Sequence, residues 1–240
     1  DPTLLKTDSY IDGVWVAQEG NEFTVTNPAT LKTLVLELGG HAPFRGFDDA
    51  DMERAVECAL SAKFATLFVQ LVEELSVGLG INDPNIGPLM NRAAIDKQQA
   101  HVDDALRQGA KLLTGGGTHP AGPLFFTPTI LGDVSKSALV FHEETFGPVA
   151  ALAPFDTEEE AVSLANASEY GLVAYLHTRD ERRIERCVGA LNYGMIAVNR
   201  TKITGAQIPF GGIKQSGLGR EGSRFGIETF THIKYVCKSI

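Results

Sequence analysis

Residues 149–198, VAALAPFDTEEEAVSLANASEYGLVAYLHTRDERRIERCVGALNYGMIAV, decide the fold, because strand patterns and helix patterns alternate through them. Three short apolar runs have the length and composition of buried strands: 149–155, 172–178 and 195–199. Thr157 and the three glutamates after it form a capping box that opens a helix to about residue 167, and a second helical pattern spans 179–191. This order predicts an α/β fold in which a parallel sheet carries helices on its faces.

The beginning of the chain adds shorter β elements. In residues 10–16, YIDGVWV, the hairpin signal Asp12-Gly13 separates two apolar runs, and a second β-like run follows at 22–28, so an N-terminal β-ribbon is predicted. Residues 33–38, TLVLEL, are apolar enough for a buried parallel strand. Glu37 then lies at the carboxyl edge of that strand, where open α/β sheets bind ligands.

Two helices are predicted before the alternating region. The acids of DDAD at 48–51 supply cap acceptors and first-turn charges that suit the positive end of a helix dipole, and apolar spacing continues the helix to residue 75. A second helix is predicted from about 91 to 108, where Gly109 stops it. The three glycines at 115–117 indicate a turn, because no Lys-Ser/Thr pair follows them as in a phosphate-binding loop.

The end of the chain is different in kind. A glycine-rich stretch at 209–222 contains GxGxxG at 217–222, but no strand precedes this match and too little chain follows it for a dinucleotide-binding unit. The last run, TFTHIKYVCK at 229–238, alternates in polarity and predicts an edge strand or a strand exchanged between subunits.

Composition restricts the class of protein. The 240 residues are 43% hydrophobic and 21% charged, as in a globular chain with a sizeable core. The net charge of -9 argues against nucleic acid and anionic membranes as partners. No apolar stretch approaches the roughly 18 residues of a membrane span, and the polar start is no signal peptide, so we expect a cytosolic protein. The three cysteines are widely spaced and predict neither a disulfide framework nor a metal site.

The stretch HEETFGPV at 142–149 is the candidate ligand site. At the entry to a strand, Glu144 and Phe146 share one face, where an acceptor beside an aromatic ring could bind a flat polar ligand such as a nicotinamide ribose. The residues alone favour a simpler interpretation, in which the glutamates are solvated loop charges and Phe146 belongs to the core.

Three motifs in order resemble those of the NAD(P)-dependent aldehyde dehydrogenases, and most of all the succinate-semialdehyde dehydrogenases: LELGG at 36–40, EETFGPV at 143–149 and PFGGIKQSGLGRE at 209–221. Together these motifs are highly specific, and the resemblance covers nearly all of 34–237. It implies an N-terminal ribbon remnant at 1–30, a domain like the family's catalytic domain at 31–226 and an oligomerisation tail at 227–240. It also implies a homodimer or a higher even-numbered oligomer and a small-molecule aldehyde as substrate.

The resemblance assigns roles to five positions. Glu37 matches the general base that activates the deacylating water. Glu144 matches the acid that binds the nicotinamide ribose of NAD or NADP, and Phe146 the aromatic residue that packs on the nicotinamide. Thr204 matches a hydroxyl near the substrate's distal carboxylate, and Phe210, which follows in the same loop, is a second substrate-binding position.

The departures from the family concern the catalytic groups themselves. Where relatives insert a cofactor-binding domain, Thr30 is followed almost at once by 34–37, and where they carry F-x-N-x-G-Q-x-C, Phe64 passes directly to Ala65. The nucleophilic cysteine and the oxyanion-stabilising asparagine therefore have no counterpart. Cys58 lies on an apolar helical pattern, which indicates a buried, inert thiol. Arg45-Gly46 replaces apolar strand residues and weakens that short strand.

Of the groups that this chemistry needs, only the base Glu37 has a counterpart, so we expect this chain to bind no cofactor and to be inactive. Three hypotheses follow. The chain is an excised or incompletely represented version of a succinate-semialdehyde dehydrogenase; it is a non-catalytic module that oligomerises through its ribbon and tail; or it binds a small ligand without chemistry.

Overall fold

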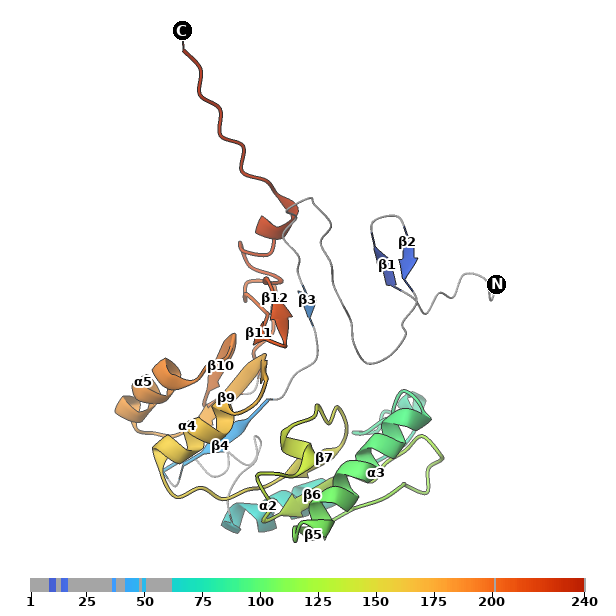
Figure 1. Ribbon diagram of the computed structural model, residues 1–240. Helices are drawn as coiled ribbons and strands as arrows, with labels where there is room; N and C mark the ends of the chain where they lie inside the picture. The colour runs from blue at the N-terminus through green and yellow to red at the C-terminus, as the bar shows by residue number, and fades with distance from the viewer. Residues whose placement is uncertain are drawn as a thin grey trace. The chain divides into compact units, whose positions relative to one another are not determined.

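The computed structural model describes residues 9–11, 14–16, 36–37, 42–47, 49–50, 62–200 and 202–239 (Figure 1). The chain divides into two compact units, 1–33 and 34–240. The elements in chain order are β1 Ser9–Ile11, β2 Val14–Val16, β3 Leu36–Glu37, β4 Phe44–Gly46, α2 Ala62–Glu73, η2 Gly80–Asn82, α3 Arg92–Arg107, β5 Lys111–Thr114, β6 Thr129–Gly132, η3 Leu139–Phe141, β7 Val149–Ala151, α4 Glu158–Asn166, β8 Tyr170–Gly171, β9 Val173–His177, α5 Glu181–Ala190, β10 Met195–Val198, β11 Ile213–Lys214, β12 Gly217–Leu218 and η4 Glu228–Phe230.

The first unit contains the predicted N-terminal hairpin. β1 and β2 pair antiparallel, with Ser9 opposite Val16 and Ile11 opposite Val14. This register matches the turn signal Asp12-Gly13 read from the sequence. The second β-like run, 22–28, lies outside the described residues.

Among its described residues, the second unit, 34–240, contains two hydrophobic cores. The first core lies on a parallel three-stranded sheet with the order β10–β9–β4. Helix α4 begins at the predicted cap, where Thr157 accepts from the Glu160 N–H at 3.1 Å. Helix α5 begins two residues after the predicted start at 179, and its cap Asp180 accepts from the N–H groups of Arg182 and Arg183. Side chains from both helices pack on β9, and the buried cluster consists of Phe47, Ala161, Ala165, Ala174, Leu176, Cys187, Leu191 and Tyr193.

β4 forms in spite of the charge at Arg45. The guanidinium Nε donates to the carbonyl of Ala161 on α4 at 3.0 Å, so the side chain has a partner where it is partly buried. Burial lowers the pKa of Arg45 from its ordinary value. The hydrogen bond to α4 thus compensates part of the desolvation that this residue costs the strand.

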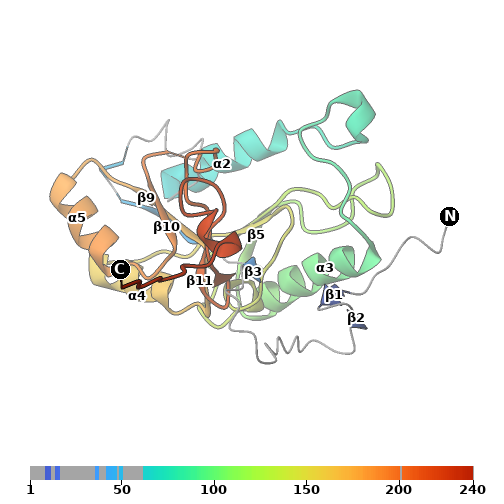
Figure 2. The same ribbon diagram turned by 90° about the horizontal axis from the view of Figure 1, so that it is seen from above.

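A second, mixed sheet has the order β5–β6–β7, with β5 antiparallel and β7 parallel to β6. Figures 1 and 2 show α2 and α3 on opposite sides of this sheet. Helix α3 has the predicted bounds: Asn91 caps it by accepting from the Ala94 N–H, and Gly109 ends the helix region with φ +94°. Apolar residues of α3, β6, η3 and the segments beside β6 and η3 make the second core: Ile95, Val102, Ala105, Phe126, Leu131, Val134, Ala138 and Val140.

The sheet topology corrects two predictions while the α/β class is confirmed. The run 149–155 was expected to join the runs 172–178 and 195–199 in one sheet, but β7 spans only Val149–Ala151 and pairs with β6. The expected parallel strand at 33–38 is also wrong where it is described, because β3 pairs antiparallel with β12, with Glu37 opposite Gly217. Strand patterns reveal burial but carry no information on the partner.

The glycine-rich stretch, 209–222, contributes two short strands that pair with earlier parts of the chain: β11 with β8, and β12 with β3. A Cβ on Gly194 would collide with the carbonyl oxygen of Gly211, so a side chain there is excluded. Gly217, Gly219 and Gly222 all have positive φ and lie in β12 and turns, with no α-helix after them among the described residues, which agrees with dismissal of the GxGxxG match.

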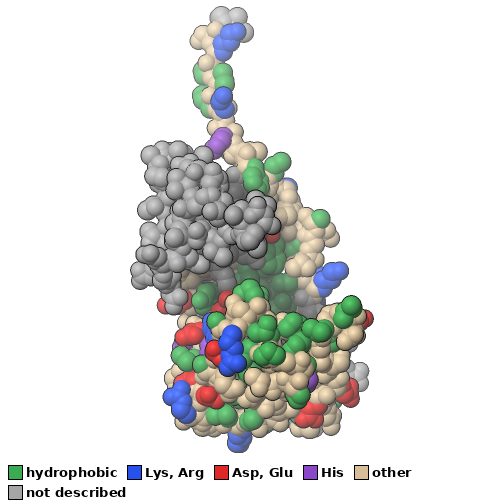
Figure 3. Space-filling view, turned by 90° about the vertical axis from the view of Figure 1, so that its right-hand side faces the viewer, with side chains coloured by type: hydrophobic (Ala, Val, Ile, Leu, Met, Phe, Trp, Pro, Cys, Tyr) green, Lys and Arg blue, Asp and Glu red, His purple; other side chains and the backbone are tan. Residues whose placement is uncertain are grey.

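The tail after η4, residues 231–239, is extended and makes no strand pairing with the described residues (Figure 1). Its apolar side chains are exposed: Ile233, Tyr235 and Val236, together with Phe230 before them. The extended segment at the top of Figure 3 shows these apolar groups mixed with basic ones. The predicted pairing as an edge or exchanged strand stays a prediction.

Among the described residues, none of the helices combines the length and hydropathy that a bilayer-spanning helix needs.

Candidate functional site

The two predicted cofactor residues lie on one loop, 142–148, between η3 and β7. Strand alternation does not explain their arrangement, because β7 begins only at Val149. Glu144 is half-buried, whereas the Phe146 ring is 85% exposed and its backbone is left-handed, with φ +39°. The simpler interpretation of Phe146 as a core residue is therefore wrong, and its ring is accessible to a ligand.

Two buried polar side chains of helix α3 form hydrogen bonds with this loop. Gln98 donates from Nε2 to the Thr145 carbonyl, and His101 contacts the Thr145 hydroxyl and the Glu143 carboxylate. Farther along α3, the Asp104 carboxylate accepts from the Leu139 N–H at 2.9 Å. This hydrogen bond, with smaller contributions from Gln108 and Arg107, holds the pKa of Asp104 below its usual value.

Glu37, the predicted base, is described only in its backbone. It sits in β3 opposite Gly217 of β12, so the fold places its main chain against the glycine-rich stretch that also contains Phe210. Its side chain lies outside the described residues.

Thr204 and Phe210, the predicted substrate residues, meet in one surface pocket of about 400 Å³. Phe210 and Glu221, which both line the pocket, exchange two backbone hydrogen bonds of 2.9 and 2.7 Å. These bonds connect the two segments that form the pocket. Thr204 is exposed and Phe210 half-buried. The pocket is lined by Thr204, Gly205, Ile208, Phe210, Glu221 and Gly222.

A second surface pocket, of about 620 Å³, is built from the same two segments. The Ser223 N–H donates to the Ala206 carbonyl at 2.7 Å and joins them. Arg224 lines this pocket, with its guanidinium 4.8 Å from the centroid of the Phe225 ring. A cation beside the Thr204 segment suits an anionic group.

The described thiols are not placed for nucleophilic chemistry. Cys187 is 1% exposed within the first core, and burial, with the nearby Glu158 charge, raises the pKa of its thiol. Cys237 is exposed in the tail. Cys58 lies outside the described residues.

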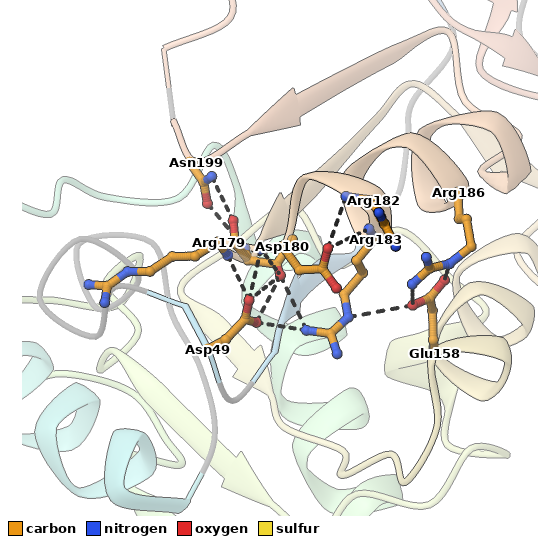
Figure 4. Close-up of polar contacts among 9 residues, drawn as sticks. Asp49, Glu158, Arg179, Asp180, Arg182, Arg183, Arg186 and Asn199 are labelled. Carbon is orange, nitrogen blue, oxygen red and sulfur yellow. Dashed lines mark hydrogen bonds and ion pairs between the residues drawn. The ribbon is translucent and has the colours of Figure 1, made fainter.

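A polar network at the carboxyl end of β9 was not foreseen from the sequence (Figure 4). Asp49 accepts hydrogen bonds from the Thr178 hydroxyl, from the N–H groups of Arg179 and Asp180, and from Arg183 Nη1 at 2.7 Å. Burial disfavours the charged carboxylate, but these donors outweigh it and lower the pKa of Asp49. The predicted helix that the DDAD acids would cap begins outside the described residues. Asp49 instead binds the two residues before α5, whose own N-cap is Asp180.

The same network continues to α4. Glu158 forms a two-pronged pair with Arg186, at 2.7 Å to each oxygen, and also faces Arg183 at 3.4 Å. These contacts tie the two helices and the end of β4 together, which indicates a structural role. Within the described parts of the chain, no group of three or more His, Cys, Asp or Glu side chains could hold a metal ion.

The sequence pattern of the aldehyde dehydrogenase family matches residues 60–236. A succinate semialdehyde dehydrogenase of Acinetobacter baylyi is 46% identical over 230 residues, covering 86% of this chain and 48% of that protein. A 3-sulfolactaldehyde dehydrogenase of Pseudomonas putida is 44% identical, covering 87% and 48%.

The crystal structure of a succinate-semialdehyde dehydrogenase from Burkholderia pseudomallei superposes with a TM-score of 0.84 at 45% identity, covering 88% of this chain and 48% of that one. The chain spans about half the length of the curated relatives it matches. The family pattern matches most of the sequence, and the fold superposes on that crystal structure, so the chain belongs to the aldehyde dehydrogenase family.

Proposed function

We propose that this chain derives from an NAD(P)-dependent dehydrogenase that oxidises succinate semialdehyde to succinate, and that the chain as given does not turn over the aldehyde. The placement of the thiols carries the second part. Thiol-dependent oxidation begins when an accessible thiolate adds to the carbonyl carbon. Cys187 is buried with a raised pKa. Cys237 is exposed, but it lies in the extended tail and lines neither surface pocket, so neither described thiol is placed to attack an aldehyde bound there.

The substrate side of the site is better preserved. Thr204 offers a hydroxyl donor at the pocket of about 400 Å³, and Arg224 adds a cation at the adjoining one. Succinate semialdehyde and 3-sulfolactaldehyde, named for two relatives, each carry an anion at the end away from the aldehyde. A hydroxyl and a guanidinium, each at one of the two pockets that the same segments line, suit such an anion. The proposed ligand class is therefore a short aldehyde or acid with a distal carboxylate or sulfonate.

The cofactor loop fits only part of a nicotinamide dinucleotide. The Glu144 carboxylate can accept from ribose hydroxyls, and the exposed Phe146 ring can pack on a nicotinamide, which when bound would accept hydride from the substrate. The described residues offer no glycine-rich turn that leads into a helix for the phosphates. We therefore expect weak binding of the nicotinamide end and no firm binding of NAD or NADP.

The test is an absorbance assay for nicotinamide reduction, with purified chain, succinate semialdehyde and either cofactor. We expect no turnover above the buffer rate, and we expect succinate to shift the resonances of 204–210 in a titration followed by NMR. Thr204→Val removes the hydroxyl at nearly constant volume and should weaken that binding, while Thr114→Val on β5 is the matched control. Turnover that Cys58→Ala abolishes would contradict the proposed inactivity and restore Cys58 as nucleophile.

The alternative of a non-catalytic assembly module is favoured by one specific observation, the exposed apolar tail. Phe230 and Tyr235 are each 85% exposed, and Ile233 is fully exposed. Apolar groups in an extended segment are typical of a strand that pairs with another chain. Under this hypothesis the chain forms a homodimer or a higher even-numbered oligomer, whether or not it binds a ligand.

A further inference from the structure

Helix α3 buries two polar side chains where apolar ones would pack at lower cost. Gln98 and His101 are each 1% exposed and lie three positions apart, so they point to the same side of the helix. A buried amide or imidazole lowers stability unless hydrogen bonds compensate for the lost water. Their partners therefore indicate what this pair does.

The hydrogen-bond partners of the pair among the described residues belong to one loop, the loop of Glu144 and Phe146. Gln98 Nε2 donates to the Thr145 carbonyl oxygen at 2.5 Å. The ring nitrogens of His101 lie 3.3 Å from Thr145 Oγ1 and 3.2 Å from Glu143 Oε2. Backbone and side-chain atoms on both sides of Glu144 are thus held from α3.

The loop's backbone is unusual at the same place. Phe146 is left-handed, with φ +39°, a conformation that is unfavourable for a bulky residue and persists only when its surroundings fix it. The next residue, Gly147, lies against the Gln98 amide so closely that a Cβ there would collide with it. Gln98 therefore contacts the chain directly before and directly after Phe146.

We propose that Gln98 and His101 are positioning residues that hold the loop 143–147 so that Glu144 and Phe146 are presented together to a nicotinamide ribose. The assignment of that ligand rests on the proposed function. The positioning itself rests on the contacts, and it is measurable without any ligand.

Substitution of Gln98 can distinguish a positioning role from a packing role, because the two roles predict different effects on the melting temperature. Its Oε1 is buried and has no hydrogen-bond partner among the described residues. An unpaired buried acceptor is unfavourable, so a leucine of similar volume removes a penalty together with one hydrogen bond. Gln98→Leu should leave the melting temperature unchanged or raise it, while the loop loses its anchor.

The experiment compares the wild-type chain with Gln98→Leu, Gln98→Ala and His101→Leu. Backbone hydrogen exchange of 142–148 should become faster, by roughly tenfold for the loss of one anchoring hydrogen bond, and the carbon-13 shift of the Thr145 carbonyl should move in both Gln98 variants. Gln99→Leu is the matched control, because the neighbouring Gln99 donates to Asp103 and Gly116, both of which lie outside the loop. It should leave the exchange of 142–148 and the Thr145 shift unchanged.

Unchanged loop exchange and an unchanged Thr145 shift in all three variants would overturn the positioning role. A general drop in melting temperature with exchange that rises equally throughout the chain would also overturn it, because packing alone would explain that result. Titration with nicotinamide mononucleotide tests the proposed function separately. If the wild-type loop does not respond to this probe although Gln98→Leu loosens it, the ribose assignment fails and the positioning stands.

Discussion

Arg183 binds Asp49 through Nη1 at 2.7 Å and places its guanidinium 4.3 Å from the centroid of the Phe47 ring. One side chain of α5 thus contacts two residues of the segment after β4, one through its charge and the other through its planar face. Because Thr178 and the N–H groups of the two residues before α5 bind the same carboxylate, Asp49 connects segments that are about 130 positions apart in sequence.

Asp49→Ala should lower the free energy of unfolding by about 2–4 kcal/mol, since it removes the acceptor of several hydrogen bonds and leaves the buried Thr178 hydroxyl without that acceptor. Urea unfolding followed by circular dichroism measures this. Asp96→Ala is the control, because Asp96 makes an exposed i,i+4 pair with Arg92 and should cost less than about 1 kcal/mol. Equal effects of the two substitutions would refute the structural importance of the network.

Acid should destabilise the chain through the same network. Hydrogen bonds from Arg186 lower the pKa of Glu158, and the donors around Asp49 lower the pKa of that carboxyl in spite of its burial. A carboxyl with a lower pKa in the folded state contributes stability above its unfolded pKa, about 4, and loses it as the pH falls through the folded value.

The melting temperature should therefore fall as the pH drops below about 5. The fall should be shallower in Asp49→Ala than in the wild-type chain, because that variant no longer has the carboxyl to protonate. Parallel curves for the two proteins between pH 7 and pH 3 would show that other groups control the acid transition.

Glu37→Gln should leave the melting temperature and the oligomeric state nearly unchanged. If no thioester forms on this chain, as proposed, the carboxylate has no water to activate for deacylation, and glutamine keeps the size of the side chain. Differential scanning calorimetry and light scattering check this. A large loss of stability would show that Glu37 anchors a buried hydrogen-bond network.

Deleting residues 227–240 should abolish assembly if the tail pairs with another subunit. The exposed apolar groups of the tail would then be buried at a boundary between subunits, and their loss should give monomers or aggregates of lower stability. Light scattering of the intact chain and of the deletion provides the comparison. A monomeric intact chain, or a deletion of unchanged assembly size, would remove the case for the assembly module.

Local signals account for what the sequence predicted well. The predicted helix starts near 91, at Thr157 and near 179 depend on residues a few positions apart, and the structure has a helix at each place, with the predicted cap at Thr157. The partner of β7 and the target of Asp49 depend on contacts between distant segments, which apolar periodicity does not encode. The exposed, left-handed Phe146 was missed for a similar reason, because α3 fixes that loop from outside it.

The two three-stranded sheets also bear on how the chain unfolds. Their buried clusters share no residue: one belongs to β9, α4 and α5, and the other to β6, α3 and η3. A sheet with its own core can open as a separate cooperative unit, with its own free energy of opening. The loop of Glu144 and Phe146 belongs with the sheet β5–β6–β7 and its core. The contacts of Asp49 belong with the sheet β10–β9–β4 and its core. Mild denaturant should therefore release them at different concentrations, and calorimetry should give a transition broader than a two-state fit allows.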